Sequence, residues 1–211
     1  MYDKTIQTEL DEYQRRFAST PGFSKLSFAL FKALLLTESG GPTSAAWNTK
    51  PCQIGNLGDP GYAVLVDHAE NSAIIMSPQL QADIASKPIN APILNIRAAI
   101  ALTLVKAALF RRQSEVDATD QSLHEHIVIK GDSFGRISRT ERTTVPEIKL
   151  SNPTVGANLK PKQKLNFHRA HMVTQITGWR PITPQFLADY YNGGGDPLYA
   201  EKISFVMEKI Q

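Results

Sequence analysis

The chain has 211 residues, of which 42% are hydrophobic and 20% charged, with a net charge of +3. This ordinary globular composition excludes collagen-like, disordered and coiled-coil classes, and at roughly 150 residues per domain it predicts one domain or a domain with a small module. The apolar stretch 98–105 is far shorter than the ~18 residues of a membrane span, so no membrane insertion is expected. The polar N-terminal segment predicts synthesis in the cytoplasm without a signal peptide, and the single Cys52 excludes an intramolecular disulfide.

The positive charge is concentrated in one segment. Residues 121–170 carry nine Lys or Arg and four Asp or Glu, a net charge of +5, whereas the rest of the chain carries −2. Such asymmetry predicts a separate module that meets an acidic surface or polymer, such as nucleic acid or an anionic cell wall. No aromatic stripe or helix-turn-helix signature supports nucleic acid as the partner. For the basic charge alone, a solvated surface is the simpler interpretation.

The first predicted helix follows Thr20-Pro21, a cap residue with proline at the first helical position. Leu26, Leu30 and Leu34 recur every four residues and predict one buried face. Gly40-Gly41-Pro42 ends this helix, because glycine leaves helical geometry easily and proline cannot continue the hydrogen bonds.

A turn-rich loop and three further helices are expected next. Asp59-Pro60 and Ser77-Pro78 each predict a cap and the first residue of a short helix, and apolar residues 73–76 predict a short strand between them. Asn95 predicts the start of a helix over 96–110 that is apolar on all sides and therefore central. Arg111-Arg112 would end that helix.

The composition then changes twice. Residues 113–122 predict a polar linker, 127–129 and 164–167 two strands, and the residues between them two short helices. After Met172 the helical pattern returns, with helix starts at Thr183-Pro184 and Asp196-Pro197. The sequence thus predicts a mainly α fold, with a helical domain made of 1–120 and 171–211 and an inserted module, 121–170.

The inserted module resembles the lysin-motif (LysM) family. A hydrophobic strand is followed by Gly-Asp-Ser, a helix, a Thr-Val-x-x-Ile-x-x-x-Asn-Pro segment and Leu-Lys-Pro-x-Gln-x-Leu. The resemblance implies a βααβ fold that binds glycans containing N-acetylglucosamine. The chain departs from the family at Phe134-Gly135, where an aliphatic pair is usual. The implied glycan-binding residues are Gly131, Asp132, Ser133, Phe134, Asn152, Pro153 and Thr154.

Glu38 is the strongest catalytic candidate. It lies four residues beyond Leu34, so it continues the apolar face near the negative end of the helix dipole. Partial desolvation and the dipole should both raise its pKa, as a general acid for glycoside cleavage requires. The alternative is a glutamate that reaches solvent from the last turn.

Four segments in order resemble the lysozyme-like family of lytic transglycosylases and goose-type lysozymes: LLLTESGG, CQIGN, LNIRAAIALTL and DYYNGGGDPLY. The resemblance covers about residues 24–110 and 180–211, and it implies cleavage of the MurNAc–GlcNAc bond of bacterial peptidoglycan. It implies that Glu38 is the catalytic acid and base, that Ser39 assists it, and that Gln53 walls the sugar cleft. Tyr191 and Asn192 match the Tyr-Asn motif that faces the acid. Cys52 replaces the usual methionine, and we interpret it as a small buried hydrophobe.

The mechanism depends on whether a second carboxylate is present. The phage-lysozyme spacing E-x8-D-x5-T fails here, because it places Trp47 and Gln53 where the acid and the threonine should be. Asp59 is the nearest downstream acid and is better explained as a helix cap. A single-acid lytic transglycosylase is therefore favoured. Muramidase hydrolysis, or a non-catalytic wall-binding component of a phage or secretion apparatus, remain alternatives.

The other candidates are weaker. His124, His126, His168 and His171 are expected to be solvent-exposed residues at strand ends, so neither a metal nor a cofactor is expected. Peptidoglycan glycan strands are the expected partner, with a cognate immunity protein or a secretion-apparatus component as further candidates. An enzyme without a signal peptide would reach the wall or periplasm by phage release or by injection. Trp47, Tyr62 and Trp179 are candidates either for stacking on sugars or for core packing.

Overall fold

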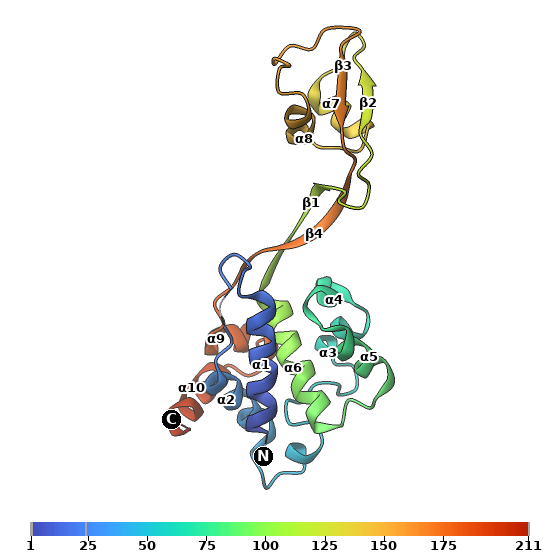
Figure 1. Ribbon diagram of the computed structural model, residues 1–211. Helices are drawn as coiled ribbons and strands as arrows, with labels where there is room; N and C mark the ends of the chain where they lie inside the picture. The colour runs from blue at the N-terminus through green and yellow to red at the C-terminus, as the bar shows by residue number, and fades with distance from the viewer. Residues whose placement is uncertain (1, 24, 211) are drawn as a thin grey trace. The chain divides into compact units, whose positions relative to one another are not determined.

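The computed structural model describes residues 2–23 and 25–210 (Figure 1). The chain forms two compact units. The first is made of Met1–Phe110 and Ile176–Gln211, and the second of Arg111–Gln175. The fold is mainly helical, as predicted. Within the described residues, no helix has the length and apolarity needed to cross a bilayer.

The two ends of the chain form helices, and the middle of the chain contains both strands and helices. The first unit contains α1 (Asp3–Phe17), α2 (Phe28–Ser39), η1 (Ala46–Asn48), α3 (Pro60–Val66), η2 (Ala69–Asn71), α4 (Ser72–Ile75), α5 (Pro78–Ser86), α6 (Pro92–Ala107), α9 (Pro184–Phe186), η3 (Leu187–Tyr191) and α10 (Tyr199–Lys209). The second contains β2 (His124–Ile127), α7 (Phe134–Thr140), α8 (Val145–Ser151) and β3 (Lys164–Phe167). The strands β1 (Ala108–Val116) and β4 (Ala170–Trp179) belong partly to each.

The N-terminal helix α1 was not predicted. Its buried residues Ile6, Leu10, Tyr13 and Phe17 lie three and four positions apart and form one apolar face. The start predicted at Thr20-Pro21 is wrong, because this dipeptide lies in a turn after α1.

Helix α2 instead begins after Ser27, whose side chain accepts a hydrogen bond from the Leu30 N–H. The predicted face of Leu26, Leu30 and Leu34 is buried. Gly40 ends the helix with a φ of 72°, as the glycine pair predicted.

Helix α6 is the centre of the first unit, since α1, α3, α4, α5 and η3 all pack against it (Figure 1). It begins at Pro92, so the predicted start at Asn95 is wrong. The caps predicted at Asp59 and Ser77 are confirmed, because each side chain accepts backbone N–H groups of the helix that follows. The strand predicted over 73–76 is wrong, since the short helix α4 occupies these residues.

Strands β1 and β4 pair as a two-stranded ribbon. They correct three predictions. The helix predicted over 96–110 ends at Ala107, and Arg111-Arg112 lie in β1 together with the first four residues of the predicted linker, 113–116. The segment after Met172 continues as a strand. Side chains bridge the ribbon, for example Gln113 to Gln175 at 2.5 Å. The pairing joins residues about 60 positions apart, which a local pattern does not reveal.

The second unit is a two-stranded antiparallel sheet with two helices between its strands in sequence. The register of β2 and β3 runs from His124 opposite Phe167 to Ile127 opposite Lys164. Strand β3 occupies the predicted residues, whereas β2 lies three residues earlier than predicted. The helices begin at the caps Ser133 and Thr144. The core of this unit consists of Val128, Ile137, Ile148, Leu165 and Phe167.

Candidate active site

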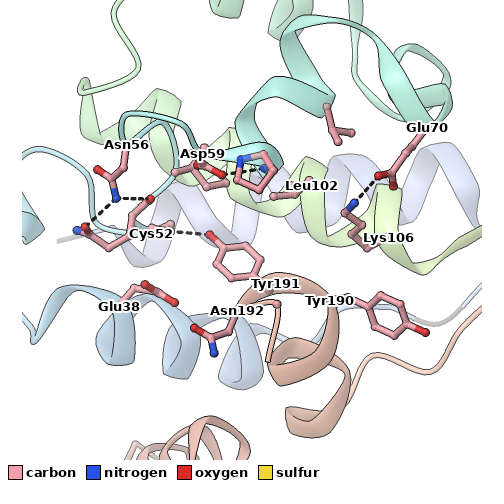
Figure 2. A pocket seen from close by; sticks show the side chains of 16 residues that line it. Glu38, Cys52, Asn56, Asp59, Glu70, Leu102, Lys106, Tyr190, Tyr191 and Asn192 are labelled. Carbon is pink, nitrogen blue, oxygen red and sulfur yellow. Dashed lines mark hydrogen bonds and ion pairs between the residues drawn. The ribbon is translucent and has the colours of Figure 1, made fainter. Parts of the chain in front are cut away.

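A cleft of about 510 Å³ lies within the first unit (Figure 2). Glu38 lines it from the last turn of α2, the loop that contains Gln53 and Asp59 forms another wall, and Lys106 contributes from α6. Tyr191 and Asn192, at the end of η3, complete it. Segments from both ends of the chain therefore build the cleft.

Glu38 is partly buried, and its Oε1 accepts a hydrogen bond from the hydroxyl of Tyr199 on α10. Burial raises the pKa of the Glu38 carboxyl, the Tyr199 hydrogen bond opposes this rise, and the negative charge of Asp59 adds to it. The net direction is upward, as predicted from the position of Glu38 on its helix. The carboxyl is therefore biased toward its protonated form.

Asn95 fixes the wall of the cleft that contains Cys52. Its fully buried side chain accepts from the Cys52 N–H at 2.9 Å and donates to the Ile54 carbonyl at 2.8 Å. The Cys52 thiol is fully buried, and burial raises its pKa well above the usual value. A thiol in this state is a poor nucleophile, in agreement with its interpretation as a small hydrophobe.

Gln53 lines the cleft next to Cys52. Its amide nitrogen donates to the Lys50 carbonyl at 2.8 Å, so the side chain is held in place. Gly55 follows with a φ of 80°, and a Cβ at this position would lie 2.5 Å from the side chain of Ile89. The loop therefore requires glycine at position 55.

Tyr191 and Asn192 both line the cleft. The Tyr191 hydroxyl donates to the Cys52 carbonyl at 2.8 Å, and Figure 2 shows its ring pointing toward Cys52. With its amide oxygen turned toward the two donors, Asn192 accepts from Gly195 N at 3.2 Å and Asp196 N at 2.8 Å. Asn192 thus braces the glycine-rich turn that precedes α10.

Ser39 is not brought into the cleft. Its buried hydroxyl donates to the Leu35 carbonyl at 2.6 Å and accepts from the Gly41 N–H at 3.2 Å, so it closes the end of α2. Trp47 and Trp179 pack in the core, and Tyr62 does not line the cleft.

Asp59 lines the same cleft as Glu38, but its carboxylate is engaged by the backbone. Oδ1 accepts from the N–H groups of Gly61 and Tyr62, and Oδ2 accepts from Gly55 N at 2.7 Å. These bonds hold Asp59 as the cap of α3, as predicted.

Three interactions at the cleft were not predicted. These are the hydrogen bond from Tyr199 to Glu38, the hydrogen bonds by which Asn95 holds the Cys52 loop, and the Glu70–Lys106 ion pair at 2.5 Å. An asparagine within an otherwise apolar helix is a signal for a buried hydrogen-bonding role. No local pattern marks Tyr199 or the ion pair, because their partners are distant in sequence.

In the second unit, two of the implied glycan-binding residues have internal roles. The Asn152 amide donates to the carbonyls of Ile148 and Asn166, and Asp132 accepts from Ile129 N and contacts His126 at 2.9 Å. Phe134 is half-buried beneath Lys149. The implied residues that remain exposed are Gly131, Ser133, Pro153 and Thr154.

The expectation of solvent-exposed histidines is wrong for His126, whose side chain is 16% exposed and contacts Asp132 and Glu141. His168 contacts the buried carboxylate of Glu147 at 2.8 Å. In the described part of the chain, no three His, Cys, Asp or Glu side chains converge as metal ligands.

Comparison with known proteins adds no relative. No family model, curated protein or solved structure matches the chain.

Proposed function

We propose that this protein cleaves the MurNAc–GlcNAc bond of bacterial peptidoglycan, with Glu38 as the catalytic acid and base. The observation that carries the proposal is a partly buried carboxyl with a raised pKa, held by Tyr199 at the wall of a cleft. A carboxyl in this state can still be protonated near neutral pH and can donate its proton to a leaving oxygen. The motifs that resemble lytic transglycosylases and goose-type lysozymes converge on this cleft.

The proposed mechanism uses one carboxyl twice. Protonated Glu38 gives its proton to the glycosidic oxygen as the bond to the anomeric carbon breaks. The resulting carboxylate then removes a proton from a hydroxyl of the same muramoyl sugar, whose oxygen bonds to the anomeric carbon and closes an anhydro ring. Gln53 and Tyr191 wall the site and exclude water. No group other than Glu38 needs to change its protonation state.

Muramidase hydrolysis is the second candidate, because Asp59 lines the same cleft and raises the pKa of Glu38. A hydrolase would use this second carboxylate to activate water or to stabilise the positive charge. The three backbone hydrogen bonds to Asp59 favour the cap role and therefore the single-acid route.

For the second unit we propose a LysM-type role in holding glycan strands. The strand, helix, helix, strand order and the caps at Ser133 and Thr144 support it. Of the glycan-binding residues that the resemblance implies, four are exposed and could contact a glycan: Gly131, Ser133, Pro153 and Thr154. A tethered glycan binder would raise the effective concentration of polymer at the cleft.

The test compares the wild type with Glu38→Gln in a turbidity assay on purified walls, followed by mass spectrometry of the soluble products. Glutamine keeps the shape and can accept the Tyr199 hydrogen bond, but it cannot transfer a proton. We expect activity to fall by roughly 10²–10⁴-fold. The matched control is Glu208→Gln, an exposed glutamate on α10, which should retain full activity. Near-normal cleavage by Glu38→Gln would refute the catalytic assignment.

A further inference from the structure

A second hollow of about 560 Å³ adjoins the cleft within the first unit. Glu70, Lys106 and Tyr190 line both spaces, so the two hollows share a wall. Figure 2 shows Tyr190 pointing away from Glu38, toward the end of the cleft where Glu70 and Lys106 pair. A polymer that extends past this end of the cleft would therefore meet the second hollow.

Arg180 lines this hollow, and three contacts fix its position. Its backbone N–H donates to the Ala107 carbonyl and its Nη1 donates to the Lys106 carbonyl, both at 2.8 Å. Its guanidinium also lies over the Tyr190 ring, 5.4 Å from the centroid. A fixed guanidinium loses little side-chain entropy when it binds a ligand.

The Arg180 guanidinium is unpaired among the residues that the structure describes. Across residues 2–23 and 25–210, no carboxylate lies within ion-pair distance of Arg180, and Glu70, the acid of this hollow, is paired with Lys106 at 2.5 Å. Within the described part of the chain, Nη1 is the one guanidinium nitrogen that donates internally, so the other N–H groups are available. A planar, prepositioned and unpaired guanidinium suits a carboxylate, which it can bind through two parallel hydrogen bonds.

We propose that this second hollow binds a carboxylate of the substrate, with Arg180 as its ligand. The inference rests on the proposed function, because every second sugar of peptidoglycan carries a lactyl group. The carboxyl of that group is either free or extended by a peptide that ends in a carboxylate. The protein would thus distinguish muramoyl glycan from chitin-like glycan by charge, outside the site of bond cleavage.

The experiment measures the affinity of the full-length Glu38→Gln protein for three tetrasaccharides by calorimetry. The probes are chitotetraose, a GlcNAc–MurNAc tetrasaccharide with free lactyl carboxylates, and the same tetrasaccharide carrying dipeptides. We expect at least one carboxylate probe to bind about tenfold more tightly than chitotetraose, as one charge-assisted hydrogen-bonded pair would give. Tighter binding of the free lactyl probe or of the peptide probe identifies which carboxylate is bound.

In the Glu38→Gln protein, the additional substitution Arg180→Gln should abolish the preference for carboxylate probes. Arg180→Lys in the same protein should retain part of that preference. A merely structural role of Arg180 would lower the affinity for all three probes alike and leave the preference intact. Arg15→Gln on α1, an exposed arginine, is the matched control. An equal loss of affinity for all three probes, or no preference in the parent protein, overturns the inference.

The outcomes separate this inference from the proposed function. If the wild type degrades walls but the parent protein shows no preference for carboxylate, the proposed function stands and the inference falls. If the wild type degrades no wall but the Arg180-dependent preference is found, the carboxylate site stands and the proposed cleavage falls.

Discussion

Tyr199 donates its hydroxyl to Oε1 of Glu38 across 161 positions of sequence. The two residues lie on α10 and α2, which pack against each other. Burial and the nearby Glu38 carboxylate raise the pKa of Tyr199, so this phenol stays protonated and keeps the proton that it donates to Glu38. The contact orients the carboxyl and stabilises its ionised form, in opposition to the effect of burial.

Tyr199→Phe should therefore raise the pKa of Glu38 further. Because a general acid loses activity as the pH rises through its pKa, the alkaline limb of the kcat/KM profile should move to higher pH. Loss of orientation should also lower kcat, by roughly tenfold for one lost hydrogen bond to a charged group. A purely structural role of Tyr199 would lower activity without moving the limb. A limb that moves to lower pH would contradict the assigned role of the hydrogen bond.

Asp59→Asn should leave the reaction products unchanged. We expect anhydro-muropeptides from both the wild type and the variant, since the Asp59 oxygens cap α3 and receive the Gly55 N–H. Asparagine is also a good cap, so the loss of stability should stay at or below about 1 kcal/mol. The products are identified by mass spectrometry. Reducing-end muramic acid from the wild type that disappears in Asp59→Asn would instead establish a two-carboxylate hydrolase.

Gly55→Ala should destabilise the loop that carries Gln53. The added Cβ would lie 2.5 Å from Ile89 and the residue would keep a φ of 80°, so strain and overpacking combine. We expect a loss of about 2–4 kcal/mol in the free energy of unfolding, measured by denaturant titration. Gly58→Ala is the matched control, because its φ is 77° but no atom lies within 4 Å of the added Cβ. Equal losses in the two variants would show that the contact with Ile89 has no cost.

The contacts of His126 predict how the stability of the second unit depends on pH. Burial lowers the pKa of His126, but its hydrogen bonds and charge interactions with Asp132 and Glu141 outweigh burial and raise it. The stabilisation is therefore complete below about pH 6.5 and is lost as the pH rises through the raised value. The pKa of Asp132 is lowered by the Ile129 N–H and by His126, so its contribution is present above about pH 4 and is lost in stronger acid.

The measurement is thermal unfolding at pH 6 and pH 8, followed by NMR signals of the second unit. We expect the melting temperature of the wild type to fall by a few degrees between these values, and His126→Asn to lose most of that fall. Glu125→Gln, which changes an exposed neighbour on the same strand, should retain it. A wild-type unit that is more stable at pH 8 than at pH 6 would contradict the prediction.

Local signals in the sequence account for much of the helical framework. Caps at Asp59, Ser77 and Thr183 are short-range hydrogen bonds, and each lies where a cap residue followed by proline predicts it. Helix α1 could also have been predicted from local spacing. Its four buried apolar residues have helical spacing, although the charged residues between them make the segment polar in composition.

The remaining features depend on distant parts of the chain. Strands β1 and β4 exist because they pair with each other, whereas their own sequences, with Arg111-Arg112 and a polar tail, predicted the end of a helix and a linker. The sequence predicts the candidate acid, because the position of Glu38 on its helix already implies desolvation. It does not predict Tyr199 as the partner, since only the packing of α10 on α2 brings the phenol to the carboxyl.

The split of the first unit in sequence has a consequence for biosynthesis. Glu38 and Cys52 are translated before the second unit, and Tyr191 and Tyr199 after it. At about 5–20 residues per second, the 161 positions between Glu38 and Tyr199 take roughly 8–30 s to translate. Throughout that interval the nascent chain holds the acid without the tyrosine that orients it, and for nearly all of it the chain also lacks the wall formed by η3. The complete arrangement of acid, orienting tyrosine and η3 wall is therefore present only after α10 has emerged.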